Sequence, residues 1–183
     1  MSKIVMIKIT DLFIPKGGNG KFTNDFCSNN KGEYPVYSSN NTEVFGKVNV
    51  FDYDGNYLTW SIVGCARYIT EINNKFSITN NRGIFIPTEK CKDIDLTYVK
   101  YVLEPILREN IKGRLGINGK NEYTTLNPAA IKKIKGKIPI PVKDDETFDL
   151  EKQQELANKY AAIETIKTEL YQHIQALTSI VVN

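Results

Sequence analysis

The largest change in the spacing of apolar and polar positions comes late in the chain. The first part has short apolar runs that alternate with polar residues and are separated by Gly, Pro and Asn, a pattern typical of short β-strands. After Ile138-Pro-Ile-Pro-Val142, a single apolar stripe recurs with helical spacing from Phe148 to Val181. We therefore predict two domains, a β-rich head over residues 1–142 and a helical arm over residues 143–183.

The head pattern predicts a series of short strands. The expected strands cover residues 3–9, 34–37, 44–51, 57–63, 67–72, 75–79, 84–86 and 136–141. Pro35 would confine its strand to a sheet edge or a strand start, and Asp54-Gly55-Asn56 predicts a hairpin-type turn. Strands this short and close together indicate a compact, mostly antiparallel β core within an α+β fold.

A few helices are expected beside these strands. Asp95 can cap a helix whose apolar positions recur every three or four residues. Pro105 would kink or divide that helix, and Gly113 can end it. Residues 114–126 are interpreted as a basic loop. Asn127-Pro128 then predicts the start of a second, short helix.

The final helix carries a stripe that predicts pairing with another helix. About 33 residues at a rise of about 1.5 Å give an arm of roughly 50 Å, and a heptad stripe of this length requires a partner helix. Packing of the helix along its own head is the alternative. The predicted pairing residues are Leu156, Tyr160, Ile163, Ile166, Leu170, Ile174, Leu177 and Val181.

Charge is distributed unevenly between the two parts. The net charge of the 183 residues is +3, but residues 1–137 carry 20 Lys and Arg against 13 Asp and Glu. Residues 138–183 carry 4 against 8. The strongest excess of basic residues lies in 98–137. Because a basic surface attracts polyanions, this segment is expected to face nucleic-acid phosphates.

No part of the sequence predicts membrane insertion or secretion. Apolar runs fall short of the roughly 20 residues that span a bilayer, and the N-terminal segment has no small-residue cleavage site. Cys27, Cys65 and Cys91 form no Cys-x-x-Cys pair and are expected to be free thiols in the cytoplasm.

Motifs for catalysis or cofactor binding are incomplete. Lys16-Gly-Gly-Asn-Gly-Lys21 lacks the first Gly and the Ser or Thr of a phosphate-binding loop. Asn127-Pro-Ala-Ala130 only partly matches the Asn-Pro-Pro-aromatic motif of DNA amino-methyltransferases. His173 is the single histidine, so a Ser-His-Asp triad or a His-based metal site is not expected. We predict no catalytic activity, metal or cofactor.

Polar residues in the loops favour DNA recognition. Arg and Asn can form paired hydrogen bonds to guanine or adenine in the major groove, and Lys suits phosphates. The alternative is that Asn, Ser and Gly are simply turn residues. The predicted DNA-binding residues are Ser38, Ser39, Asn40, Asn41, Asn80, Asn81, Arg82, Lys112, Arg114, Lys120, Asn121 and Tyr123.

A series of short motifs also resembles a known family. In order, they are Gly32-Glu-Tyr-Pro-Val-Tyr-Ser-Ser39, Asp54-Gly-Asn-Tyr-Leu58, Gly64-Cys-Ala66, Phe76-Ser-Ile-Thr-Asn80, Ile131-Lys-Lys-Ile134, Ile138-Pro-Ile-Pro141 and Asp149-Leu-Glu-Lys-Gln153. Their order is similar to that in a target recognition domain of the DNA-specificity (S) subunit of type I restriction-modification systems and related methyltransferase-fused enzymes.

The resemblance implies a head that reads one half of a split double-stranded DNA target without catalysing a reaction. It also implies that the final helix is a spacer, which pairs antiparallel with a second such helix and docks the methyltransferase (modification) subunits. Modification and restriction would reside in other subunits or domains. These expectations place the chain in a cytoplasmic restriction-modification complex.

One departure from the family leaves alternatives open. A full S subunit has two recognition domains and two spacer helices, whereas this sequence predicts one of each. The chain is therefore a half-subunit that forms a homodimer, a fragment of a longer subunit, or the recognition end of a fused enzyme. Other readings are a helix-dimerised protein-interaction module that does not bind DNA, and an intact small enzyme.

Overall fold

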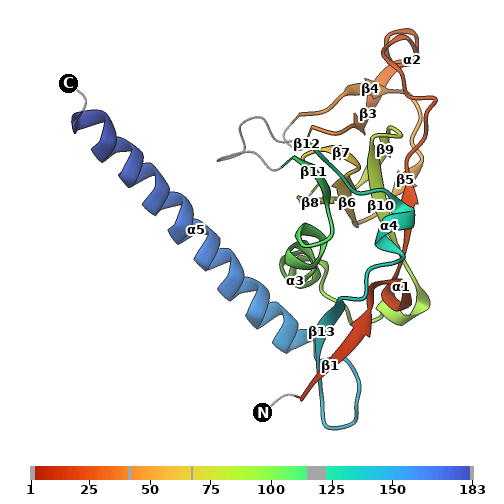
Figure 1. Cartoon of the computed structure of the whole chain (residues 1–183). Coiled ribbons are helices and arrows are strands. Elements are labelled where there is room, and N and C mark those ends of the chain that lie inside the picture. The colour runs from red at the N-terminus through yellow and green to blue at the C-terminus, as the bar shows by residue number, and fades with distance from the viewer. Residues whose placement is uncertain (1–2, 41–42, 67, 115–122, 182–183) are drawn as a thin grey trace.

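The computed structural model describes residues 3–40, 43–66, 68–114 and 123–181, with side chains as far as Leu177 in the last helix. It shows a head of small sheets and short helices from which one long helix extends (Figure 1). The class is mixed α+β with mostly antiparallel sheets, as predicted.

The described strands are β1 (Lys3–Lys8), β2 (Phe13–Gly17), β3 (Lys31–Tyr37), β4 (Gly46–Val48), β5 (Tyr53–Asp54), β6 (Tyr57–Ser61), β7 (Val63–Gly64), β8 (Ile69–Ile72), β9 (Lys75–Ile78), β10 (Arg82–Pro87), β11 (Lys112–Arg114), β12 (Tyr123–Thr125) and β13 (Lys137–Val142). The described helices are α1 (Ile9–Leu12), α2 (Asn24–Asn29), the 3-10 turn η1 (Glu89–Cys91), α3 (Leu96–Arg108), α4 (Pro128–Ile131) and α5 (Leu150–Val181).

The strands form four small sheets. Their orders are β2-β10-β6-β8, β4-β3-β9-β5, β11-β12-β7 and β1-β13. The pairing of β3 with β9 is parallel, and the other pairings between these strands are antiparallel. Strand β10 borders β2 and β6, while the turn before it touches the second sheet. The start of β10 therefore joins the two larger sheets.

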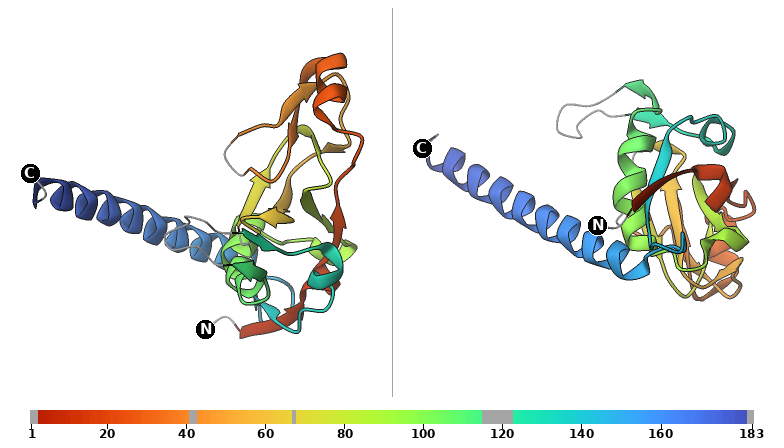
Figure 2. Two further views of the ribbon diagram at one scale, coloured as in Figure 1. Left: turned by 45° about the horizontal axis from the view of Figure 1, so that its top comes forward. Right: turned by 90° about the horizontal axis from the view of Figure 1, so that it is seen from below.

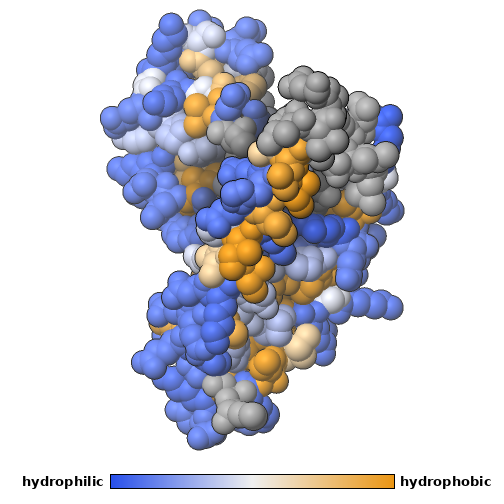
Figure 3. Space-filling view, turned by 90° about the vertical axis from the view of Figure 1, so that its left-hand side faces the viewer, coloured by the Kyte–Doolittle hydropathy of each residue, from blue (hydrophilic) through white to orange (hydrophobic). Residues whose placement is uncertain are grey.

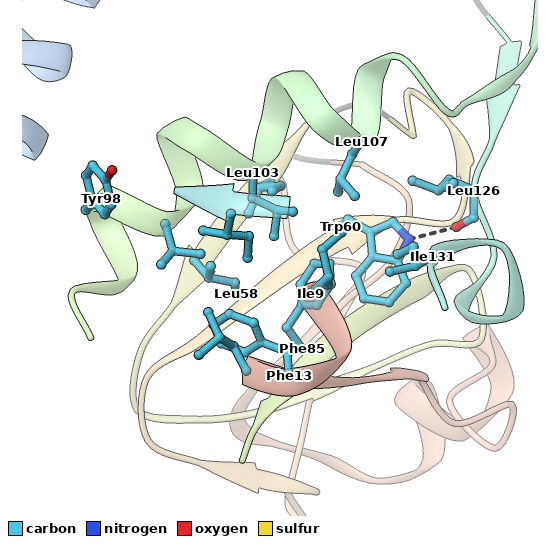
Figure 4. Packing of buried hydrophobic residues seen from close by; sticks show 14 of the residues in the cluster. Ile9, Phe13, Leu58, Trp60, Phe85, Tyr98, Leu103, Leu107, Leu126 and Ile131 are labelled. Carbon is cyan, nitrogen blue, oxygen red and sulfur yellow. Dashed lines mark hydrogen bonds between the residues drawn. The ribbon is translucent and has the colours of Figure 1, made fainter. Parts of the chain in front are cut away.

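The main core lies between the β2-β10-β6-β8 sheet, α3, α4 and β13. Trp60 is fully buried there, and its indole Nε1 donates to the carbonyl oxygen of Leu126 at 2.7 Å (Figure 4). The ring of Trp60 lies 4.5 Å from that of Phe85, between centroids. Gly83 is required beside it, because a Cβ at that position would come within 2.2 Å of the indole ring. A smaller cluster around Phe76 and Ile78 supports the second sheet.

Two strand predictions near the second sheet are wrong. β3 is an inner strand between β4 and β9, so Pro35 is not at an edge. The β9 pairing involves Val36 and Tyr37 but not Pro35, which lies opposite Lys47 of β4. The Asp54-Gly55-Asn56 turn does not join a hairpin, because β5 pairs with β9 and β6 pairs with β8 and β10.

The helix boundaries of the head also differ in part from expectation. Asp95 caps α3 as predicted, accepting a hydrogen bond from the backbone N–H of Tyr98 at 2.6 Å. Pro105 lies inside α3 without dividing it, and α3 ends at Arg108 rather than at Gly113. Residues 24–29 form a helix that was not predicted. The predicted 114–126 loop contains part of two paired strands, β11 and β12.

Helix α5 is held at its first turns and then leaves the head. The carboxylate of Asp149 accepts a hydrogen bond from the backbone N–H of Lys152 at 3.0 Å and so caps the helix. Gln153 and Ala157 are buried against the head. Every side chain described from Asn158 to Leu177 is exposed. Figure 2 shows α5 projecting from the region of β1 and β13, with its C-terminal end away from the head.

Candidate nucleic-acid interface

The loop after β3 and the turn before β10 form one polar surface. The backbone N–H of Thr79 donates to the carbonyl oxygen of Tyr37 at 2.9 Å. Its hydroxyl donates to the hydroxyl of Ser38 at 2.9 Å and accepts from the N–H of Asn81 at 3.3 Å. These contacts bring residues 38–40 and 80–82, the described parts of two of the three predicted DNA-binding segments, together.

Arg82 lies beneath this surface, with a side chain that is 0 % exposed. Its Nε donates to the carbonyl oxygen of Ser38 at 2.8 Å, and its Nη2 donates to that of Asn40 at 3.2 Å. Nη1 reaches the hydroxyl of Thr59 at 3.4 Å. Burial lowers the pKa of Arg82 to about 10, while the nearby Tyr37 opposes this shift. The guanidinium therefore stays charged at neutral pH.

An open cavity of about 460 Å³ lies over the loop. The residues around it come from both segments and from the residues just before β4: Ser38, Ser39, Asn40, Glu43, Val44, Phe45 and Asn81. The Nδ2 of Asn40 donates to the carboxylate of Glu43 at 3.4 Å. Glu43, Val44 and Phe45 were not among the predicted DNA-binding residues, and the strand expected over 44–51 is described only at Gly46–Val48. The sequence signal for these three residues is that one acidic and two apolar residues directly follow a polar loop.

The third predicted segment is the β11–β12 hairpin. Lys112 and Arg114 are exposed on β11, and Tyr123 on β12 is 58 % exposed. The hairpin is fixed to the head through Thr124, whose buried hydroxyl donates to the carbonyl oxygen of Gly64 at 3.0 Å. Asn41, Lys120 and Asn121 were also predicted to bind DNA and lie outside the described residues.

A short backbone path connects the hairpin with the first two loops. The N–H of Ile62 donates to the carbonyl oxygen of Asn81 at 2.9 Å, and the carbonyl oxygen of Ile62 accepts from the N–H of Leu126 at 2.9 Å. Ile62 therefore lies between the 79–82 turn and the residue that follows β12. Asn80 and Asn81 are exposed at this turn.

Not all basic residues of segment 98–137 lie near the two polar loops and the hairpin. Lys100 and Arg108 lie on α3 and border a cavity of about 400 Å³ between α3 and α5. Arg108 forms an ion pair with Glu104 at 3.3 Å. Burial raises the pKa of Glu104, which favours its protonated form. Lys132, Lys133, Lys135 and Lys137 are exposed around α4 and the start of β13.

The predicted pairing stripe of α5 divides into two parts. Leu156 packs against the main core, and the ring of Tyr160 stacks on that of Tyr101 with 5.4 Å between centroids. Beyond them the stripe is exposed, by 47 % at Ile163, 62 % at Ile166, 58 % at Leu170, 50 % at Ile174 and 63 % at Leu177. Figure 3, seen from the side toward which α5 points, shows apolar residues gathered in a row. The side chain of Val181 is outside the described part.

Two other kinds of site, a metal site and a membrane-spanning helix, are absent from the described residues. In that part of the chain, no three His, Cys, Asp or Glu side chains are grouped so that they could hold a metal ion. None of the helices within it is long and apolar enough to cross a membrane.

Comparison with known proteins identifies similar chains. A protein of Mycoplasma pneumoniae named as a type I specificity subunit, S.MpnORF507P, is 33% identical over 119 residues, which are 62% of this chain and 32% of that protein. The type I restriction enzyme MpnII specificity subunit of the same organism is 29% identical over 101 residues, covering 54% of this chain and 31% of that protein.

Solved structures agree in fold. The crystal structure of a type I restriction-modification S subunit from M. genitalium superposes with a TM-score of 0.64 at 15% identity. The match covers 90% of this chain and 40% of that one. A chain from a study of the assembly of a type I restriction-modification system gives a TM-score of 0.58 at 10% identity, covering 91% and 40%.

The chain thus spans about a third of the length of these curated relatives. The family model for the type I restriction modification DNA specificity domain matches residues 1–176, which include both the head and most of α5. The two joined polar loops, the exposed hairpin and most of the projecting helix lie within this match. The chain belongs to the family of type I restriction-modification DNA specificity domains.

Proposed function

We propose that this chain is the sequence-reading component of a restriction-modification complex and that its head binds double-stranded DNA. The observation that carries the proposal is the joining of the 38–40 loop to the 79–82 turn by direct hydrogen bonds. Specific recognition requires several donors and acceptors held in fixed positions. Membership of the DNA-specificity family supports the same conclusion.

Base and phosphate contacts come from different residues in this proposal. Asn40, Asn81 and Ser39 border an open cavity and carry groups that can bond to base edges. Lys112 and Arg114 are exposed on the hairpin and suit phosphates. Glu43 can accept a hydrogen bond from the amino group of cytosine. Lys100 and Arg108 are not among the DNA contacts of this proposal, because they face the cavity between α3 and α5 beside two carboxylates.

Helix α5 pairs with a second helix of the same kind in this proposal. Its exposed stripe from Ile163 to Leu177 is too long and too apolar for a solvated helix face. Antiparallel pairing would set the distance between two heads and hence between two half-sites. The second helix belongs to another copy of the chain or to another part of a longer protein. Two identical heads would demand a palindromic split site.

The same proposal places catalysis in partner subunits. Methyltransferase and restriction subunits would supply modification and cleavage, and the paired helices would dock the methyltransferase. A fused methyltransferase–restriction enzyme would place these activities in the same polypeptide as the head. The chain incubated alone with DNA and S-adenosylmethionine should transfer no methyl group.

The decisive experiment tests binding and then specificity. The full chain, alone and with its methyltransferase partner, is titrated against duplex DNA at two salt concentrations. We expect affinity to fall steeply with salt, because neutralised phosphates release counterions. Methylated positions mapped across a genome should then define one split sequence. A matched variant, Asn40→Ala with Asn81→Ala, should lose that sequence.

A second reading, a helix-dimerised protein-interaction module, predicts a different outcome. In that case the dimer would form, but duplex DNA would bind without salt dependence or not at all, even in the presence of the methyltransferase. That result would refute DNA recognition and leave helix pairing intact.

A further inference from the structure

Arg82 connects the two polar loops from below. Two of its side-chain hydrogen bonds end on backbone carbonyl oxygens of one loop, those of Ser38 and Asn40. A bond to a carbonyl oxygen constrains the path of the backbone, whatever side chains the loop carries. What Arg82 holds is therefore the conformation of the loop that borders the cavity.

The backbone of Arg82 is equally well anchored on the other side. Its N–H donates to the carbonyl oxygen of Thr79 at 3.0 Å, and its own carbonyl oxygen accepts from the N–H of Gly18 at 2.9 Å. In β10, Arg82 also lies opposite Ser61 of β6. Arg82 thus connects the 38–40 loop to the 79–82 turn and to the β2-β10-β6-β8 sheet.

Its burial argues against a direct contact with DNA. The side chain is 0 % exposed and charged at neutral pH, because its pKa of about 10 is well above 7. To reach a base edge, the guanidinium would have to leave the carbonyl oxygens of Ser38 and Asn40. Two charge-assisted hydrogen bonds to these partly buried carbonyl oxygens would then be lost, which is unfavourable.

We propose that Arg82 is a positioning residue for sequence reading: it holds the 38–40 loop and the 79–82 turn as one rigid surface for base contacts. This inference rests on the proposed function. It assigns Arg82 a role beneath the interface, different from the base contact expected from the sequence. Thr79, whose hydroxyl binds that of Ser38, is a second and weaker link between the same segments.

Rigidity matters more for specific than for non-specific binding. Base readout needs several hydrogen-bonding groups in place at once, whereas phosphate contacts tolerate a mobile loop. Loss of the Arg82 link should therefore lower affinity for the preferred site and leave affinity for other duplexes nearly unchanged. Several base pairs should be affected together, because the whole loop shifts.

The test uses the full chain and three variants. The wild type first selects its preferred site from a library of random duplexes. Arg82→Lys keeps the charge but lacks the planar fork of donors. Thr79→Val removes the link to Ser38 and leaves Arg82 in place. Arg108→Lys, on α3 and away from the loops, is the matched control.

The expected result for Arg82→Lys is a loss of at least about tenfold in affinity for the preferred site, spread over several base pairs. Affinity for random duplex should change by no more than about twofold. Thr79→Val should lose less affinity for the preferred site than Arg82→Lys does. Arg108→Lys should bind the preferred site as tightly as the wild type. In the DNA-free chain, hydrogen exchange of amides in residues 36–40 should accelerate in Arg82→Lys.

Other outcomes would overturn the proposal. A loss confined to one base pair, with unchanged exchange, makes Arg82 a direct reader, and equal losses on all duplexes make it a phosphate contact. If the wild type selects no sequence, the proposed function is refuted. The Arg82 link is then tested by hydrogen exchange alone, and unchanged exchange in residues 36–40 of Arg82→Lys refutes it. If Arg82→Lys does not fold by circular dichroism, Thr79→Val tests the joined surface itself, and wild-type site selection and hydrogen exchange of that variant refute the need for a rigid joined surface, on which the proposal rests.

Discussion

The side chain of Gln153, in the second turn of the long helix, accepts a hydrogen bond from the backbone N–H of Asp95 at 3.0 Å. Its Nε2 donates to the carbonyl oxygen of Asp93, also at 3.0 Å. Asp95 caps α3, so this one amide connects the start of α3 with the base of α5. Gln153 is 0 % exposed. The direction in which α5 leaves the head therefore depends on a buried polar contact.

Gln153→Leu should destabilise the protein by about 1–3 kcal/mol, because the buried amide is removed and its two hydrogen bonds to the backbone of Asp93 and Asp95 are lost. The measurement is chemical denaturation followed by circular dichroism. Gln154→Leu is the matched control, because Gln154 is the next residue of the same helix and its side chain is exposed. Equal stability of the two variants would show that the contact does not hold α5.

Ile163→Asp with Leu170→Asp should abolish pairing of α5, because charges in an apolar helix interface are strongly unfavourable. Sedimentation should report a monomer with a folded head. Thr165→Asp with Gln172→Asp places the same charges on the opposite face of the helix and should leave the oligomeric mass unchanged. If the wild type is already monomeric, self-pairing is refuted and the second helix must come from elsewhere.

Lys112→Ala should weaken binding to all duplex sequences to a similar extent and reduce the salt slope by about 1, if its ammonium group neutralises one phosphate. Affinities measured at several salt concentrations test this expectation. Lys159→Ala is the control, because Lys159 lies on α5 and is paired with Glu155. An unchanged slope for Lys112→Ala would place the hairpin away from the phosphates.

Tyr98 should make stability depend on pH in the alkaline range. Burial, and to a smaller extent Tyr160, raises the pKa of Tyr98 from 10.0 to about 12. Its hydroxyl donates to the carbonyl oxygen of Pro139 at 2.8 Å. A raised pKa means that the stabilising contribution is complete below pH 10 and is lost as pH rises through about 12.

The free energy of unfolding should therefore decrease between these pH values by about 1–2 kcal/mol more in the wild type than in Tyr98→Phe. Denaturation at a series of pH values measures the free energy of unfolding of both proteins. Subtracting one curve from the other removes the contribution of the other tyrosines and of the lysines, which both proteins share. Parallel curves for the two proteins would remove Tyr98 as the cause.

Local chemistry was sufficient for several elements of the fold. Asp95 and Asn127 cap the helices that were expected after them, because a cap needs only a side-chain oxygen and the next turn. The long apolar stripe predicted α5, and Pro139 and Pro141 suited a strand with one partner, β1. The polar composition of residues 38–41 and 80–82 indicated the candidate interface.

Long-range pairing was not predictable in the same way. Asp54-Gly55-Asn56 has the composition of a hairpin turn, yet β5 pairs with β9. Pro35 has an edge-strand signature, yet β3 has a partner on each side. A strand's partner is chosen by which apolar faces bury one another, and segments separated by many residues compete for each face.

The amino-acid sequence by itself determined the local elements, the apolar stripe of α5 and the resemblance to a DNA-specificity family, because these depend on the order and spacing of neighbouring residues. Only the tertiary structure decided that Arg82 lies beneath the polar loops and that Leu156 and Tyr160 pack on the head. Burial is a property of the assembled sheets and helices. The same polar residue can be a surface contact or an internal support, and its neighbours in space decide which.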